Sequence, residues 1–504
     1  MNDPKRNAGF DFDECLREEL SYMTPPESVI GAITPWRNAT RRILIGCALT
    51  MITFEVLMLQ YILPAIGMVM MLTGFRTLRQ ENVWFARGYR ASLLCVILQY
   101  PVYFVNATIW GDVVAAHPAW KVMTTVRTMA YLVQLLALWQ GMGQVQKKAG
   151  REPKAKAGLV LVLLYTLLWG MAAIDVTNVF LILLLLIVYI LAWRNLRTLS
   201  QELDHVGYVV RSASLRVPDQ AVQVAYFVMI FLCLGIGYIG FSKYPMTWSE
   251  KKDIYDSIEV QEICKDLIAL GFPKTVLEDL TPEDILLCQD AKRVVVQQND
   301  HEVVSGEYGE RRGARGVYLG KYEVKKILRI TGIGVEMAGE PQQWKLIHHF
   351  AWLTEPKMIG TEGLQIWGAD HVNISWNKVR PVSGQVLYDQ NGLTYSASYY
   401  RIENTEKTWE NYLSFSYPKE GERYRGYVTY HIQKQSLDGI IDTVVHYIHH
   451  TDLIRYPLQS AVEYRKYRDF FLGERPYDLV WDGLQFFPPW LDGETTEQPG
   501  EGIE

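Results

Sequence analysis

The chain has no apolar run long enough to cross a membrane after residue 241, although long apolar runs fill much of the sequence before it. A membrane-spanning helix needs about 20 consecutive, mostly apolar residues. Segment 222–241, VQVAYFVMIFLCLGIGYIGF, is the last stretch that meets this requirement. We therefore expect a membrane domain before this point and a water-soluble domain after it.

Positive charge is scarce in the carboxy-terminal part. Residues 242–504 contain 29 Lys and Arg against 40 Asp and Glu, whereas residues 1–241 contain 21 against 15. A surface that binds nucleic acid needs a basic patch to neutralise phosphates. The acidic balance of the soluble part therefore excludes nucleic acid as its predicted partner.

Cysteine is also rare, with six residues in the whole chain. Such a number is too small for a disulfide-built scaffold of this length. Only Cys264 and Cys288 fall in the soluble part, and they form a candidate disulfide if that part lies outside the cytoplasm. The alternative is that both are small buried core residues.

Motifs of common enzyme classes are missing. The sequence contains no HExxH zinc motif, no GxSxG nucleophile elbow and no phosphate-binding loop of an ATPase. Histidines gather late in the chain, and His348, His349, His446 and His450 would converge only if the two strands carrying them paired. Without a cysteine or carboxylate at ligand spacing, we predict no metal and no cofactor, and these histidines remain the candidates if a metal binds.

Seven apolar segments before residue 242 predict about seven membrane spans. The segment 43–75 is too long for one span and contains Pro64 near its middle, so two short helices are favoured over a single long tilted helix. The predicted spans are 43–59, 62–75, 91–109, 122–144, 158–174, 178–193 and 222–241.

Orientation follows from the basic residues, which favour the cytoplasmic side of a membrane. If the amino terminus is inside, the cytoplasmic segments hold 19 of the 21 Lys and Arg of this part, the outer connections hold Lys121, and Arg127 lies within a span. Seven spans then place the carboxy-terminal part outside the cytoplasm, with the plasma membrane as the predicted location.

Two charged residues fall within predicted spans, Glu55 and Arg127. Counting 1.5 Å per residue from the ends of their helices places both in the outer part of the bilayer. Because an unpaired charge at that depth is costly, we predict that the two form an ion pair. The alternative interpretation is a ligand or ion pathway.

The soluble part predicts a helical linker over residues 242–291 and an all-β extracytoplasmic domain over 292–491. The linker contains Thr281-Pro282-Glu283-Asp284, the residue types of a helix start. The following residues alternate between apolar and polar, with a hairpin signal at Asn391-Gly392, and predict an antiparallel sandwich or open barrel. Residues 492–504 are acidic, and we expect them to be disordered.

This layout is typical of a non-enzymatic sensor, receptor or scaffold whose outer domain binds an unidentified extracytoplasmic ligand. The cytoplasmic segment 1–42 is a candidate docking site for a cytoplasmic protein, or else packs on the chain's own inner surface. Two other function classes stay open. One is an accessory subunit of a transporter or envelope-assembly machine, and the other is a membrane-tethered hydrolase.

Overall fold

The computed structural model describes residues 35–51, 58–174, 179–205, 213, 216–252, 257–312, 318–368, 376–378, 380–404, 410–434, 441–452, 455–466 and 477–486. The predictions for residues 1–34, for Glu55 and for the acidic tail lie outside these residues. The chain forms two compact units. We call Met1–Val105 with Asp112–Gly235 the helical unit, and Asn106–Gly111 with Ile236–Glu504 the β unit.

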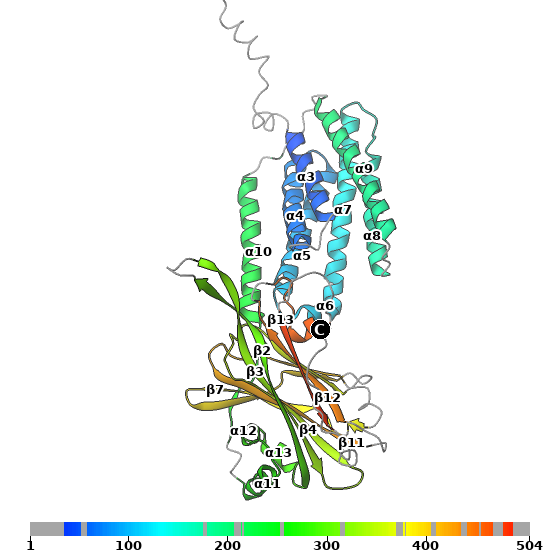
Figure 1. The fold of residues 1–504 in the computed structure, drawn as a ribbon. Coiled ribbons are helices and arrows are strands. Elements are labelled where there is room, and N and C mark those ends of the chain that lie inside the picture. The colour runs from blue at the N-terminus through cyan, green and yellow to red at the C-terminus, as the bar shows by residue number, and fades with distance from the viewer. Residues whose placement is uncertain are drawn as a thin grey trace, which may run out of the picture. The chain divides into compact units, whose positions relative to one another are not determined.

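Helices overlap every predicted span. Four of them are long and apolar enough to cross a membrane, namely α4, α7, most of α9 (Phe180–Leu203) and α10, which indicates a membrane protein. The helices from α3 to α10 are α3 (Pro35–Met51), α4 (Leu59–Leu78), α5 (Val83–Asn106), α6 (Gly111–Ala116), α7 (Pro118–Lys148), α8 (Lys156–Ala173), α9 (Val179–His205) and α10 (Asp219–Phe241) (Figure 1).

Helices α3 and α4 pack against each other in antiparallel directions. A Cβ atom added to Gly46 would lie 2.6 Å from the carbonyl oxygen of Gly67, and one added to Gly74 would lie 2.7 Å from that of Ala39. Such contacts bring the two backbones together as only glycine allows. The described residues of 43–75 thus form two helices, as predicted, and not one long helix.

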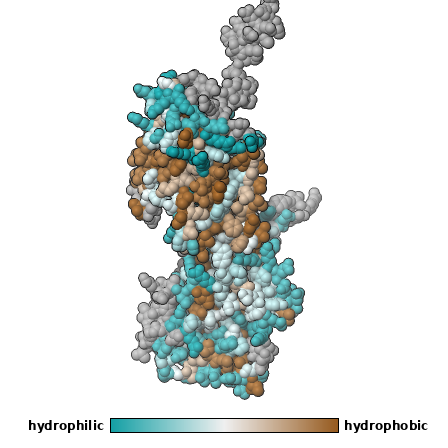
Figure 2. Space-filling view, turned by 180° about the vertical axis from the view of Figure 1, so that it is seen from behind, coloured by the Kyte–Doolittle hydropathy of each residue, from teal (hydrophilic) through white to brown (hydrophobic). Residues whose placement is uncertain are grey.

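Most ion-paired residues of the helical unit lie near helix ends, although Arg42 lies within α3. Asp219 at the start of α10 pairs with Arg42 of α3 and, at 3.1 Å, with Arg76 of α4. Lys148 at the end of α7 pairs with Glu81 at 2.8 Å. On the face drawn in Figure 2, this unit has a hydrophobic band next to a hydrophilic end. This separation of charged ends from apolar middles is the pattern expected of helices in a bilayer.

The β unit contains two antiparallel sheets that share one hydrophobic core. Sheet A has the order β1-β8-β7-β11-β4-β3-β2, with β6 also paired to β11, and sheet B has the order β13-β12-β5-β10-β9. Val386 and Phe350 of sheet A pack with Leu364 and Tyr447 of sheet B in this core. The structure therefore confirms an antiparallel all-β region and fits the sandwich prediction.

The strands vary widely in length. Strands β2 and β3 form a long hairpin, of which only Leu328–Met337 also pairs with β4. The bounds are β1 (Ser249–Glu250), β2 (Ala291–Arg312), β3 (Tyr318–Met337), β4 (Gln343–Trp352), β5 (Glu362–Gly368), β6 (Trp376–Lys378), β7 (Ser383–Gln390), β8 (Leu393–Ser398), β9 (Arg401–Asn404), β10 (Asn411–Phe415), β11 (Glu422–Lys434), β12 (Ile441–His450) and β13 (Tyr477–Phe486).

The turn between β7 and β8 confirms the predicted hairpin. Asn391 has a φ of 52° and Gly392 a φ of 80°, so both central residues take the left-handed conformation that a two-residue hairpin turn requires. Asparagine and glycine adopt this conformation at low cost. The sequence therefore sets the register of these two strands locally.

Helices of the predicted linker cover part of one face of sheet A. They are α11 (Ile258–Ala269), α12 (Lys274–Leu277) and α13 (Pro282–Leu286), and a further short helix, α15 (Ala461–Lys466), follows β12. Leu267 and Ile285 pack on Ile333 and Ile347 of the sheet. The helix start at Thr281 is confirmed, since its hydroxyl accepts from the Asp284 amide at 3.1 Å.

Candidate functional site

A cavity of about 360 Å³ opens on this same face of sheet A, next to α12. Cavities of this size hold small ligands. Its lining combines several basic side chains with two acidic ones and three threonines. The lining residues are Lys251, Thr275, Val276, Glu278, Asp279, Gln298, Arg329, Thr331, His349, Ala351, Leu353, Thr394, Arg423 and Arg425.

Strand pairing brings the lining side chains to one face. Thr331 is paired with His349, and Ala351 is paired with both Arg329 and Arg425. Directly paired residues of an antiparallel sheet point to the same side, and every second residue does so along each strand. Three neighbouring strands, β3, β4 and β11, thus present a polar patch where the cover by the helices ends.

Asp279, which follows α12, is the centre of a buried ionic network. Arg425 Nε donates to Asp279 Oδ1 at 2.8 Å, and His349 Nε2 lies 2.9 Å from Oδ2. Both the His349 and Asp279 side chains are only 6% exposed. Arg425 also donates to Asp389 at 2.9 Å, so its guanidinium bridges two carboxylates. Such charge-assisted bonds hold the side chains in one geometry.

The network keeps Asp279 ionised. Burial alone would raise the pKa of its carboxyl group, but the hydrogen bond from His349 and the charge and hydrogen bond of Arg425 outweigh burial and lower the pKa. Burial alone would lower the pKa of the Arg425 guanidinium. The carboxylates of Asp279 and Asp389 have a larger effect in the opposite direction and raise this pKa. The floor of the cavity therefore carries fixed charges at neutral pH.

The rim of the cavity is basic and accessible. The Arg423 side chain is 72% exposed and pairs with Asp389. Arg329 Nε and Nη2 donate to the two oxygens of Asp300 at 2.7 and 2.9 Å, which holds the guanidinium on the sheet. With Lys251 these residues surround the opening with donors that suit a carboxylate or another anionic group.

A second buried carboxylate fixes the helices that frame the cavity. Lys345, with a side chain that is fully buried, donates to Asp284 Oδ1 at 3.0 Å, and Tyr427 donates to Asp284 Oδ2 at 2.6 Å. Asp284 belongs to α13, whereas Lys345 and Tyr427 belong to sheet A. Asp279 and Asp284 thus attach this segment of the cavity wall to the sheet at two points. Such a double attachment supports a preformed site.

The four histidines considered for a metal do not meet. His348 and His349 lie on β4 in sheet A, whereas His446 and His450 lie on β12 in sheet B, so the strand pairing required for such a site does not form. His348 contacts Thr443, and His450 stacks on Tyr477. Among the described residues, no group of three His, Cys, Asp or Glu side chains is placed to hold a metal ion.

Cys264 and Cys288 come together in the core beneath the linker helices. Both are buried free thiols in the structure, and burial raises the pKa of each. A buried thiol with a raised pKa reacts slowly. Their location matches the alternative in which they act as small core residues, and the disulfide stays a hypothesis for the protein in an oxidising compartment.

Arg127 of α7 has a polar partner on a neighbouring helix. Its Nη1 atom donates to Gln99 Oε1 of α5 at 2.5 Å. Because Glu55 lies outside the described residues, its pairing with Arg127 stays a prediction. The contact with Gln99 shows that α5 supplies a hydrogen-bond partner for Arg127, which the charge pattern of the sequence alone did not indicate.

The residues that build the cavity were largely missed by sequence reasoning. Of the residues that line the cavity, only His349 is a candidate site residue in the sequence, and there as a metal ligand. Asp279 and Arg425 are separated by 146 positions and carry no motif. The available signal was the position of Asp279 in the stretch VLEDLTPED, three residues after Val276, which helical periodicity assigns to the same buried side as Val276.

Comparisons with known proteins add no identification. No family model matches the chain, and no curated protein matches it. Among solved structures, the collagen-binding domain of the Erysipelothrix rhusiopathiae surface protein RspB aligns over 31% of this chain and 75% of its own, with 11% identity and a TM-score of 0.15. A TM-score at this level supports no inference about fold or ligand.

Proposed function

We propose that the chain is a plasma-membrane protein with seven spans, its amino terminus in the cytoplasm and its β unit outside. The four long apolar helices support membrane insertion. Helices α3, α5 and α8 overlap the remaining three predicted spans, and α3 and α4 run as an antiparallel pair. The basic residues on one side of the predicted spans support the orientation.

The β unit, in this proposal, is the ligand-binding part of a non-enzymatic sensor, receptor or scaffold. The observation that supports this role is the cavity of about 360 Å³ with Asp279, His349 and Arg425 at its floor and a basic rim. A rim of arginine and lysine donors favours a small acidic ligand, such as a uronic acid or a short acidic peptide. Any signal to the cytoplasm would pass through the helical unit.

A thermal-shift screen of the full-length protein in detergent tests this role. Uronic acids and acidic peptides should raise the unfolding midpoint, because a ligand that binds only the folded state stabilises it, and their neutral amides should not. Arg423→Gln should remove most of the shift, whereas Lys292→Gln, an exposed charge on β2 outside the cavity, should keep it.

Two results would contradict the proposal. Equal shifts for Arg423→Gln and the wild-type chain would mean that the ligand binds elsewhere. Turnover of a bound ester or glycoside by the wild-type protein would instead support the membrane-tethered hydrolase, and the non-enzymatic role would be abandoned.

A further inference from the structure

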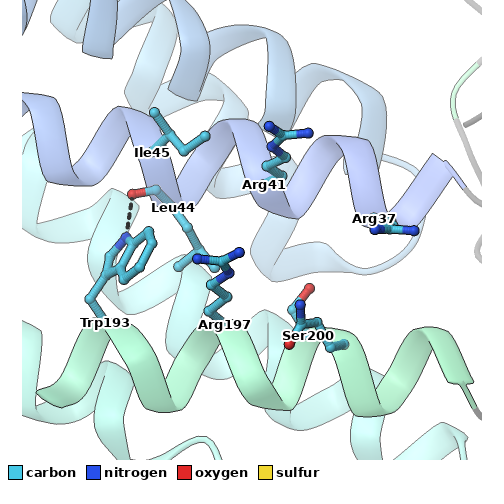
Figure 3. Close-up of a pocket in the computed structure, with 8 residues that line it drawn as sticks. Arg37, Arg41, Leu44, Ile45, Trp193, Arg197 and Ser200 are labelled. Atoms are coloured by element: carbon cyan, nitrogen blue, oxygen red, sulfur yellow. Dashed lines mark hydrogen bonds between the residues drawn. The ribbon is translucent and has the colours of Figure 1, made fainter. Parts of the chain in front are cut away.

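A second cavity, of about 280 Å³, lies within the helical unit between α3 and α9. Each helix contributes four residues at positions i, i+4, i+7 and i+8, which is the spacing of a single helix face. The lining residues are Arg37, Arg41, Leu44 and Ile45 from α3, and Trp193, Arg197, Ser200 and Gln201 from α9 (Figure 3).

The two faces run antiparallel, so the cavity has one polar end and one apolar end. At the apolar end, Trp193 Nε1 donates to the Leu44 carbonyl oxygen at 2.8 Å. At the polar end, the hydroxyl groups of Thr40 and Ser200 lie 2.7 Å apart. Figure 3 shows Arg41 and Arg197 at intermediate positions along the two helices. A ligand here meets guanidinium groups beside an indole ring and aliphatic carbons.

The charge of this cavity is positive. Among the residues that the structure describes, its lining includes Arg41 and Arg197 and no carboxylate. Arg197 lies over the Trp193 ring, 5.7 Å from its centroid, which orients its guanidinium group without neutralising it. The cavity is therefore built to attract an anion.

The apolar end continues onto a surface suited to hydrocarbon. Ile190 lies three residues before Trp193, on the neighbouring part of the α9 surface, and is 44% exposed. Tryptophan is enriched where a membrane meets water, and basic pockets between helices on the cytoplasmic side bind acidic lipid head groups. The arginines belong to segments that the charge distribution assigns to the cytoplasmic side.

We propose that the cavity between α3 and α9 binds the phosphate group of an anionic phospholipid. Arg41 and Arg197 contact the phosphate oxygens, Ser200 lies at the polar end, and the acyl chains lie against Trp193 and Ile190 of α9. Arginine suits this role because its planar guanidinium group can donate two parallel hydrogen bonds to a phosphate. The site is distinct from the cavity of the β unit and goes beyond the function proposed above.

Native mass spectrometry of the full-length protein in detergent tests the proposal. The protein is titrated with short-chain phosphatidic acid, with phosphatidylcholine of the same chain length, and with inorganic phosphate. We expect phosphatidic acid to bind at least about tenfold more tightly than phosphatidylcholine, because a net negative head group gains charge-assisted hydrogen bonds from the arginines. Inorganic phosphate, which lacks acyl chains, should bind more weakly than phosphatidic acid.

Matched variants locate the site. The double variant Arg41→Gln, Arg197→Gln should weaken phosphatidic acid binding at least about tenfold, while Arg194→Gln, an exposed arginine on α9 that does not line the cavity, should change it less than about twofold. Arg41→Gln alone disturbs no ring contact and should still weaken binding. Unfolding midpoints measured without lipid verify that each variant is folded.

Each outcome of these measurements either supports or overturns the proposal. Loss of phosphatidic acid binding in the arginine variants but not in Arg194→Gln supports the site. Inorganic phosphate binding as tightly as the lipid, with the same dependence on Arg41, would indicate a site for soluble phosphate and would overturn the assignment to a phospholipid. Unchanged binding in the double variant, an equal loss in Arg194→Gln, or equal affinity for phosphatidylcholine would overturn the proposal.

Discussion

Asp279 and Asp284 have different partners, although both attach the linker to sheet A. Asp279 accepts from Arg425 and His349 at the cavity floor, and Asp284 accepts from Lys345 and Tyr427 in the adjoining core. A buried carboxylate with its partners intact is tolerated, but removing its charge leaves the partners buried and uncompensated. Single substitutions at these positions should therefore have large effects.

Replacing Asp279 by asparagine should destabilise the β unit by about 1–3 kcal/mol, because the buried Arg425 guanidinium loses one of its two carboxylate partners and keeps only Asp389. The measurement is chemical unfolding of the full-length protein in detergent. Glu278→Gln is the matched control, since the side chain of Glu278 is 48% exposed and lies 3.7 Å from Lys274. A loss no larger than that of Glu278→Gln would show that the network contributes little stability.

Three buried histidines should make the β unit sensitive to mild acid. Burial lowers the pKa of His348 and of His431 to about 4 and that of His450 to about 3, from an ordinary value of 6.5. Between about pH 6.5 and pH 4, the unfolded chain binds protons on these rings that the folded chain does not, so unfolding takes up protons. Stability must then fall as the pH falls through this window.

The expected slope is roughly 1.4 kcal/mol per pH unit for each histidine within its window. Unfolding midpoints of the full-length protein measured between pH 7 and pH 4 would reveal it. His348→Gln should reduce the slope by about one third, since one of three such groups is removed. A midpoint that stays constant over this range would contradict the assigned burial of neutral imidazoles.

At the scale of elements, the contact between α3 and α4 is set by glycine. Gly46 and Gly67 each place their Cα where a Cβ would meet the other's carbonyl oxygen at 2.6 Å. Gly46→Val should therefore force the helices apart and destabilise the helical unit by about 1–3 kcal/mol. Thermal unfolding in detergent measures this loss. Gly170→Val on α8 is the control, because a Cβ there meets nothing within 4 Å.

Which elements form was readable from the sequence, but how they pair was not. The apolar runs predicted the helices, although α3 begins at Pro35 and not at residue 43, because Trp36 and Ala39 are also buried. The turn residues Asn391-Gly392 predicted one hairpin. The separation of β4 and β12 into different sheets depends on contacts between distant residues, which periodicity does not encode. For the same reason the partners of His349 could not be predicted.

At the scale of the whole molecule, the proposed orientation can be tested by labelling. A cysteine at Lys419, an exposed position in the β unit, should react with a membrane-impermeant thiol reagent in intact cells. A cysteine at Glu152, exposed between α7 and α8, should react only after permeabilisation. Ala155 is unsuitable for this purpose because it is only 2% exposed.

The wild-type chain controls for background labelling of its own cysteines, of which Cys47, Cys95, Cys264 and Cys288 are buried and Cys233 is half-buried. Labelling of Glu152→Cys in intact cells together with protection of Lys419→Cys would place the β unit in the cytoplasm. That result would require an even number of spans and would remove the proposed extracytoplasmic ligand.

The position of β11 determines when sheet A can be completed during synthesis. Strand β11 lies between β4 and β7 and is the only described strand that joins the half β1-β8-β7 to the half β4-β3-β2. Both halves are synthesised before residue 422. Until β11 follows, the edges of β7 and β4 that pair with it stay unpaired, and unpaired strand edges are prone to aggregation. A chaperone that shields strand edges until β11 arrives would therefore raise the yield of folded protein, and truncation before Glu422 would leave two half-sheets that cannot join.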